Sequence, residues 1–243
     1  MAPILNLIRL KEELTAIGGQ QAQSRDKGHF HEALYLGNKN YRGNKNVDNN
    51  TILNKFLVKY GDLMVEIKNR INSALDMLGR DDQPVSVINL ESAALQTRKV
   101  IECVMHASVV VNVDNIASGL TKEWNANKLM ARVEIINPNY YPQPVKLEIN
   151  GGVKTWVADK GFISKADFKA LYNKIGELAH AKSPFNNKKI DIQTIKKEML
   201  IALRQLIKLL NHHFVLLPDG KSRIVCIMED GKGGVQTTYW KAM

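Results

Sequence analysis

The chain has 243 residues, 44% of them hydrophobic, so it can bury a sizeable core in one large domain or two small ones without disulfide bonds. Its 34 basic and 24 acidic residues give a net charge of +10, which favours a polyanion or an acidic protein as partner. No stretch approaches the roughly 20 apolar residues of a membrane span, and no signal peptide is evident, so we expect a cytoplasmic protein without membrane contact.

Sequence motifs for the common kinds of catalytic or cofactor site are absent. The two cysteines, Cys103 and Cys226, lack zinc spacing and an obvious pairing, which suits the reducing cytosol of a bacterium or phage host. The chain has no phosphate-binding glycine loop, no nucleophile elbow and no close carboxylate pair, so we expect no metal and no cofactor. It also lacks basic strands interleaved with aromatic residues, which would stack nucleic-acid bases.

The first 50 residues are expected to form a short amphipathic helix over 2–15 and a flexible basic loop over 20–50. The loop is rich in Asn, Gly and Lys and cannot bury much apolar surface. It is either a solvated linker or an arm that contacts phosphates. His29 and His31 have no third ligand at a recognisable spacing, so they predict no metal site.

Apolar residues at steps of three or four predict a helical bundle within a single domain, residues 51–243. The second helix is apolar on nearly every side of its C-terminal half, so we expect it to be central and buried. Expected N-caps are Thr51, Ser164 and Asp191, and Gly79 and Pro138 are expected stops. The predicted helices span residues 51–78, 90–113, 121–136, 164–180 and 191–210.

The strands are predicted to form a hairpin and a C-terminal meander. "VKLEI" and "VKTWVA" flank Asn150-Gly151-Gly152, which is a strong hairpin signal. After residue 212, two Asp-Gly turns separate the apolar runs "HFVLL", "RIVCIME" and "VQTTYW", which predicts a three-stranded antiparallel meander. The expected fold class is therefore α+β, mainly a bundle of about five helices with a hairpin and a small C-terminal sheet.

A polar row interrupts the most apolar helix. Arg98, Glu102 and His106 stand four residues apart, which places them along one stripe. An unpaired buried charge costs several kcal/mol, so these side chains need partners. Two interpretations remain open: an intrahelical Arg98–Glu102 pair, or a polar seam that faces another helix or a second subunit, with Arg98 available for a phosphate or carboxylate.

The segment "KIGELAHAKSPF" ends the fourth predicted helix with a histidine. Lys174 and His180 lie some 120° apart around that helix, but they could converge on one cleft at its frayed last turn. A helix C-terminus favours a protonated histidine, which would suit acid–base chemistry. Alternatively, His180 only caps the terminal carbonyls before Pro184.

These two helices resemble those of the HEPN superfamily and its bacterial relatives. The resemblance rests on "LQTRKVIECVMHASVV", on the later "LYNKIGELAHAKSPF" and on "WNANKLMARVEIINPNYYPQP" between them, and it covers roughly residues 88–217. It implies a helical bundle, commonly dimeric, whose active members cleave RNA without metal by means of an arginine and a histidine. His180 matches the histidine. Lys174 stands where the arginine is usual, and Ile175 replaces the polar residue beside it.

The resemblance implies a homodimer that acts on RNA in a bacterial or phage defence or toxin system, with a partner protein as a further expected contact. As a metal-independent endoribonuclease, it would use His180 to move the proton and Lys174 or Arg98 to stabilise the phosphorane charge. Lysine lacks the planar fork of arginine. The alternative is a non-catalytic binding or scaffolding subunit for nucleic acid, a nucleotide or a protein. Expected binding residues are Glu102, His106, Tyr172 and Lys182.

Overall fold

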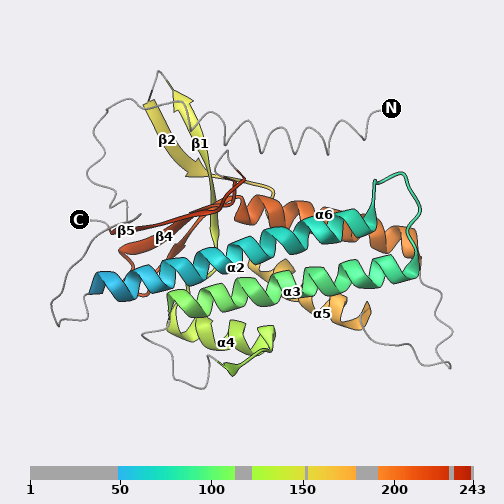
Figure 1. The fold of residues 1–243 in the computed structure, drawn as a ribbon, viewed down its shortest axis with the longest axis horizontal. Coiled ribbons are helices and arrows are strands. Elements are labelled where there is room, and N and C mark those ends of the chain that lie inside the picture. Colours follow the sequence, from blue (N-terminus) through green and yellow to red (C-terminus); the bar gives the residue numbers. More distant parts are fainter. Residues whose placement is uncertain (1–48, 113–121, 151–152, 179–190, 230–232, 242–243) are drawn as a thin grey trace.

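The computed structural model of the protein describes residues 49–112, 122–150, 153–178, 191–229 and 233–241 (Figure 1). These residues form five helices and a five-stranded antiparallel sheet, which confirms the α+β fold with a helical bundle and a C-terminal meander. The predicted N-terminal helix and basic loop, including His29 and His31, lie outside the described residues. None of the described helices has the length and apolar character needed to cross a membrane.

The helices follow the predicted apolar periodicity, but three of them begin elsewhere than expected. Helix α2 already includes Asn49, so the predicted cap Thr51 lies within the helix and does not cap it. Helix α3 starts three residues early because Ser86 Oγ accepts the Asn89 N–H, and α4 starts five residues late because Asn125 accepts the Lys128 N–H. The predicted cap at Asp191 is confirmed. The helices are α2 (Asn49–Leu78), α3 (Val87–Val111), α4 (Ala126–Ile136), α5 (Lys165–Leu178) and α6 (Ile192–Leu210).

The hairpin and the meander belong to one sheet with strand order β2-β1-β3-β4-β5. They join because Gln143 and Pro144, at the start of β1, pair with Phe214 and His213 of β3. Beyond that point β1 pairs with β2 alone, and the hairpin extends past the helices (Figure 1). The strands are β1 (Gln143–Asn150), β2 (Val153–Ala158), β3 (His212–Leu216), β4 (Ser222–Ile227) and β5 (Gln236–Lys241).

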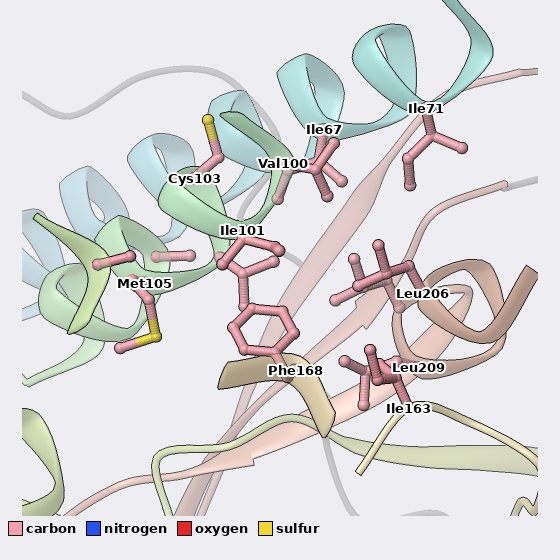
Figure 2. Packing of buried hydrophobic residues seen from close by; sticks show 14 of the residues in the cluster. Ile67, Ile71, Val100, Ile101, Cys103, Met105, Ile163, Phe168, Leu206 and Leu209 are labelled. Atoms are coloured by element: carbon pink, nitrogen blue, oxygen red, sulfur yellow. The ribbon is translucent and has the colours of Figure 1, made fainter. Parts of the chain in front are cut away.

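The core lies between α3 and the helices packed around it (Figure 2). Ile67 of α2, Ile101 of α3, Phe168 of α5 and Leu206 of α6 are almost completely buried there. Helix α3 carries buried residues along its whole length, which confirms the prediction that it is the central helix. Apolar burial of this kind is the main stabilising term of the fold.

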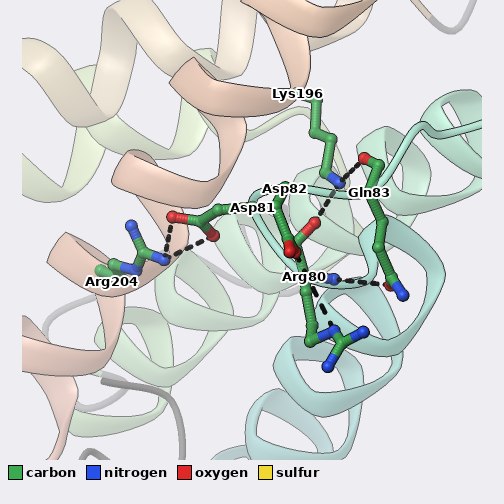
Figure 3. A network of polar contacts seen from close by, with 6 residues as sticks. All are labelled: Arg80, Asp81, Asp82, Gln83, Lys196 and Arg204. Atoms are coloured by element: carbon green, nitrogen blue, oxygen red, sulfur yellow. Dashed lines mark hydrogen bonds and ion pairs between the residues drawn. The ribbon is translucent and has the colours of Figure 1, made fainter. Parts of the chain in front are cut away.

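A polar clamp joins the α2–α3 loop to α6 (Figure 3). The fully buried Lys196 donates to the carbonyl oxygens of Arg80 and Gln83 at 2.5 and 2.6 Å. Next to it, Arg204 Nη2 donates to both carboxylate oxygens of Asp81, at 2.8 and 2.9 Å. The loop thus has fixed partners on α6 although it has little apolar surface of its own.

Helix α2 is fixed to the sheet by a buried pair of polar side chains. His213 Nδ1 lies 2.8 Å from the carbonyl oxygen of Leu210, so Nδ1 must carry the proton, because a carbonyl only accepts. His213 Nε2 therefore accepts from the Tyr60 hydroxyl, at 2.7 Å. Gly61 of α2 faces β5, and a Cβ there would lie 3.7 Å from the Thr237 side chain, which is ordinary van der Waals contact.

Candidate functional site

The structure brings three of the predicted site residues together between α3 and α5. Arg98 Nε donates to Glu102 Oε1 at 3.1 Å, and Arg98 Nη2 donates to the Tyr172 hydroxyl at 3.2 Å. That hydroxyl in turn donates to Glu102 Oε1 at 3.2 Å. The guanidinium also lies 4.9 Å from the centre of the Tyr172 ring, within cation–π range. Arg98 and Glu102 therefore form the expected intrahelical pair, and the same pair forms a polar seam with Tyr172 of α5.

The neighbouring side chains hold the Arg98 guanidinium in this arrangement. Partial burial lowers the pKa of Arg98, but the hydrogen bonds and charges of Glu102 and Tyr172 outweigh that effect and raise it. Gly176 leaves room for the side chain, since a Cβ there would lie 3.4 Å from Arg98 Nη1. The guanidinium thus has a carboxylate and a phenol as partners, and holding a phosphate would require it to leave them.

Lys174 lies apart from this cluster. Its Nζ pairs with Glu198 Oε2 of α6 at 2.7 Å, and its side chain is 55% exposed. It follows Tyr172 by two residues, or about 200° of helix rotation, so it projects away from Arg98. His106 is partly buried one turn beyond Glu102. His180 and Lys182 lie outside the described residues.

A second candidate site lies on the face of the sheet that points away from the helices, called here the outer face. On the opposite face, His213 and Val215 of β3 and Ile224 and Cys226 of β4 are buried. Directly paired residues share a face, so the register defines the outer face. None of the described strand residues on it is Asp or Glu. Its partly or fully exposed members include Val145, Leu147, Ile149, Trp156, Phe214, Leu216, Arg223, Val225, Ile227 and Trp240.

Five side chains form a row across the outer face, called here the stacking row: Trp156, His212, Phe214, Arg223 and Trp240. The Trp156 and His212 rings meet edge to face with centroids 5.5 Å apart. Phe214 follows His212 on the same face, and the Arg223 guanidinium lies 5.0 Å from the centre of its ring. Arg223 pairs directly with Trp240 in the register of β4 and β5.

Four of the five side chains of this row are partly or fully exposed to solvent. Trp156 is 39% exposed and Trp240 41% exposed, while Phe214 and Arg223 are partly exposed. His212 is buried beneath Trp156, and this burial lowers its pKa, so the imidazole is neutral at neutral pH. The row therefore presents three aromatic rings and one cation.

Sequence reasoning missed the stacking row because its members come from four strands, which only the register of the sheet brings together. Basic and aromatic residues do alternate in two short strands, Lys154 with Trp156 in β2 and Lys241 with Tyr239 in β5, and the register adds Phe214 and Arg223 beside them. The available signal was the alternation in the meander, which places Phe214 and Arg223 on one face once the strands are paired.

Comparison with known proteins gives no relative from which a site could be transferred. No family model matches the chain, and no curated protein or solved structure matches it.

Proposed function

We propose that the protein binds single-stranded RNA through the stacking row, as a non-catalytic HEPN-like component of a bacterial or phage defence or toxin system. The observation that carries this proposal is the acid-free outer face with three aromatic rings and Arg223. The homodimer and the partner protein implied by the HEPN resemblance belong to the same proposal.

The chemistry of the stacking row suits unpaired bases. A base in a duplex already stacks on its neighbours, whereas a splayed base can stack on Trp or Phe. Each such contact contributes about 1–3 kcal/mol and tolerates sequence variation. Arg223 supplies a cation for the phosphate backbone, and the net charge of +10 favours approach of a polyanion.

The Arg98 cluster favours binding over catalysis. Arg98 is hydrogen-bonded to Glu102 and Tyr172, and Lys174 is paired with Glu198. Neither cation is positioned to stabilise a phosphorane together with the other. This supports the alternative in which the chain binds RNA without cleaving it.

Removing one ring from the stacking row is expected to weaken RNA binding. Trp240→Ala and Phe214→Ala should each raise the Kd for a short labelled single-stranded RNA by roughly 5- to 150-fold, the equivalent of one lost base stack. Fluorescence anisotropy measures this directly. Trp124→Ala is the matched control, because Trp124 is 66% exposed but lies just before α4, away from the row.

The salt dependence supplies a second measurement. Arg223→Gln should flatten the slope of log K against log salt by about 0.7, the value for one phosphate contact on a single strand. Lys197→Gln, which removes an exposed cation on α6, should leave the slope unchanged. Equal affinity for duplex and single strand, or an unaltered Kd in Trp240→Ala, would refute the proposed site.

The same RNA recovered after incubation tests the non-catalytic part separately. Intact RNA is the expected result on a denaturing gel. Cleavage that disappears in His180→Ala would overturn the non-catalytic reading without affecting the stacking row.

A further inference from the structure

The outer face of the sheet carries more apolar surface than a solvated sheet face usually does. An antiparallel sheet that packs on a core with one face generally carries polar side chains on the other. Here Ile149, Trp156 and Trp240 have 57%, 39% and 41% of their surface exposed. Six aliphatic residues accompany the stacking row on this face: Val145, Leu147, Ile149, Leu216, Val225 and Ile227.

Unpaired bases would cover only part of this apolar surface. Base stacking needs a flat ring such as that of Phe214 or Trp240. The branched side chains of Val225 and Ile227 offer no such plane, and they gain most from contact with other aliphatic groups. Contiguous exposed apolar patches mark interaction sites. The outer face therefore also suits an amphipathic protein segment.

The first residues of the chain have the matching pattern. Leu7, Leu10, Leu14 and Ile17 follow one another at steps of three, four and three, which predicts one apolar stripe along a helix. The helix predicted over 2–15 would be about 21 Å long and 10 Å wide. Five strands of five to eight residues give a sheet face of roughly 20 Å by 20 Å. The predicted helix thus matches the outer face in size.

The chain enters α2 close to the edge of this face. Thr237 of the edge strand β5 donates through Oγ1 to the carbonyl oxygen of Leu57 in α2, at 3.2 Å (Figure 1). Trp240 of the same strand lies on the outer face. Residues 18–48 join the predicted helix to α2, and a stretch of about 30 residues can span up to roughly 100 Å. The first residues therefore have only to pass the β5 edge to reach the outer face.

The charges of the segment and the face are compatible. Glu12 and Glu13 stand between Leu10 and Leu14 in the sequence. On the outer face, Arg223 offers a cation, and none of the described strand residues there is Asp or Glu. The carboxylates of the segment thus meet no like charge among those residues.

We infer that residues 4–17 dock on the outer face of the same chain, with the stripe from Leu7 to Ile17 against its aliphatic residues. In the docked state the helix covers Trp156 and Trp240, so a base cannot stack on them. The segment and RNA are then alternative occupants of one surface, and the segment regulates access to the stacking row. This competition rests on the proposed RNA binding, whereas the docking itself does not.

Tryptophan fluorescence tests the docking without RNA. The chain has three tryptophans, so Trp124→Phe leaves only Trp156 and Trp240, both on the outer face. In this background Leu10→Ser/Leu14→Ser should raise the acrylamide quenching constant by roughly twofold, because two leucines no longer hold the segment over the rings. Ala16→Ser is the matched control, since Ala16 lies about 140° around the helix from the stripe and its change should leave quenching unaltered.

RNA affinity tests the competition. With Trp124 restored, Leu10→Ser/Leu14→Ser should bind the short single-stranded RNA about 10-fold more tightly than the wild type. That gain corresponds to an outer face that is free in about one wild-type molecule in ten. Ala16→Ser should bind RNA as the wild type does.

Equal quenching in the double variant and its Trp124→Phe parent would overturn the docking. Protection of the tryptophans that increases with protein concentration would overturn it too, because the face would then belong to a second copy. Increased quenching with an unchanged Kd would refute the competition alone. If no variant bound RNA, the proposed function would fail, and the quenching result would still decide the docking.

Discussion

Replacement of Lys196 by methionine is expected to lower the free energy of unfolding by about 3 kcal/mol. The Nζ of Lys196 donates to the carbonyl oxygens of Arg80 and Gln83. Methionine fills a similar volume but donates nothing, so both carbonyls lose the ammonium donor, and the Arg80 carbonyl keeps the Gln83 N–H. Desolvation lowers the pKa of Lys196 while Asp81 and Asp82 raise it, and both carboxylates lose a nearby cation in the variant.

Urea denaturation followed by circular dichroism measures this loss. Lys197→Met is the control, because Lys197 is the next residue on α6, is exposed, and should change stability by less than about 0.5 kcal/mol. Arg204→Met should lower the free energy of unfolding by about 1 kcal/mol, a loss between those of the other two variants, because its ion pair with Asp81 is about one-third exposed. Equal midpoints for Lys196→Met and Lys197→Met would mean that the clamp adds nothing to stability.

The helices could be predicted because their signal is local. The apolar period defined α2, α3, α5 and α6, and Ser164 and Asp191 were identified as caps from their side-chain chemistry alone. The apolar period continues through Trp124 and therefore predicts too early a start for α4, whereas the side chain of Asn125 caps the helix. Which of several nearby residues begins a helix can thus depend on one side-chain hydrogen bond at the N-cap.

The candidate sites depend on contacts between distant parts of the sequence. Helical spacing predicted the Arg98–Glu102 pair, but only the packing of α5 on α3 supplies the Tyr172 hydroxyl. Lys196 is partnered by carbonyls of a loop more than a hundred residues earlier. The stacking row needs the register of four strands. Such partners follow from tertiary packing, which a single sequence does not encode as a local pattern.

Acid is expected to destabilise the fold through His213 in particular. Burial lowers the pKa of His213 to about 4, with the Leu210 carbonyl opposing and His212 reinforcing this effect. In the unfolded chain the imidazole titrates near 6.5. The neutral form is therefore favoured by folding. The resulting stability is fully present above about pH 6.5 and is lost as the pH falls toward 4.

Tyr60 and Cys226, which lie beside His213, do not titrate in this range, whereas His212 does. Burial raises the pKa of the Tyr60 phenol well above 10, and burial likewise raises the pKa of the Cys226 thiol. Burial lowers the pKa of His212, which acts in the same direction as His213. The loss between pH 7.5 and 4.5 attributable to His213 should be about 2–3 kcal/mol.

His213→Gln tests this assignment, because glutamine can offer both a donor and an acceptor but has no proton to gain. Between pH 7.5 and 4.5, the unfolding free energy of His213→Gln should fall by roughly 2–3 kcal/mol less than that of the wild type. Tyr60→Phe is the control: it removes the hydrogen bond to Nε2 and lowers stability at neutral pH, but it leaves the buried imidazole to titrate. Denaturant titrations of His213→Gln, Tyr60→Phe and the wild type at pH 7.5 and 4.5 measure this difference. If His213→Gln lost as much stability in acid as the wild type, the acid sensitivity would arise elsewhere, and the buried Tyr60–His213 pair would contribute only packing and one hydrogen bond.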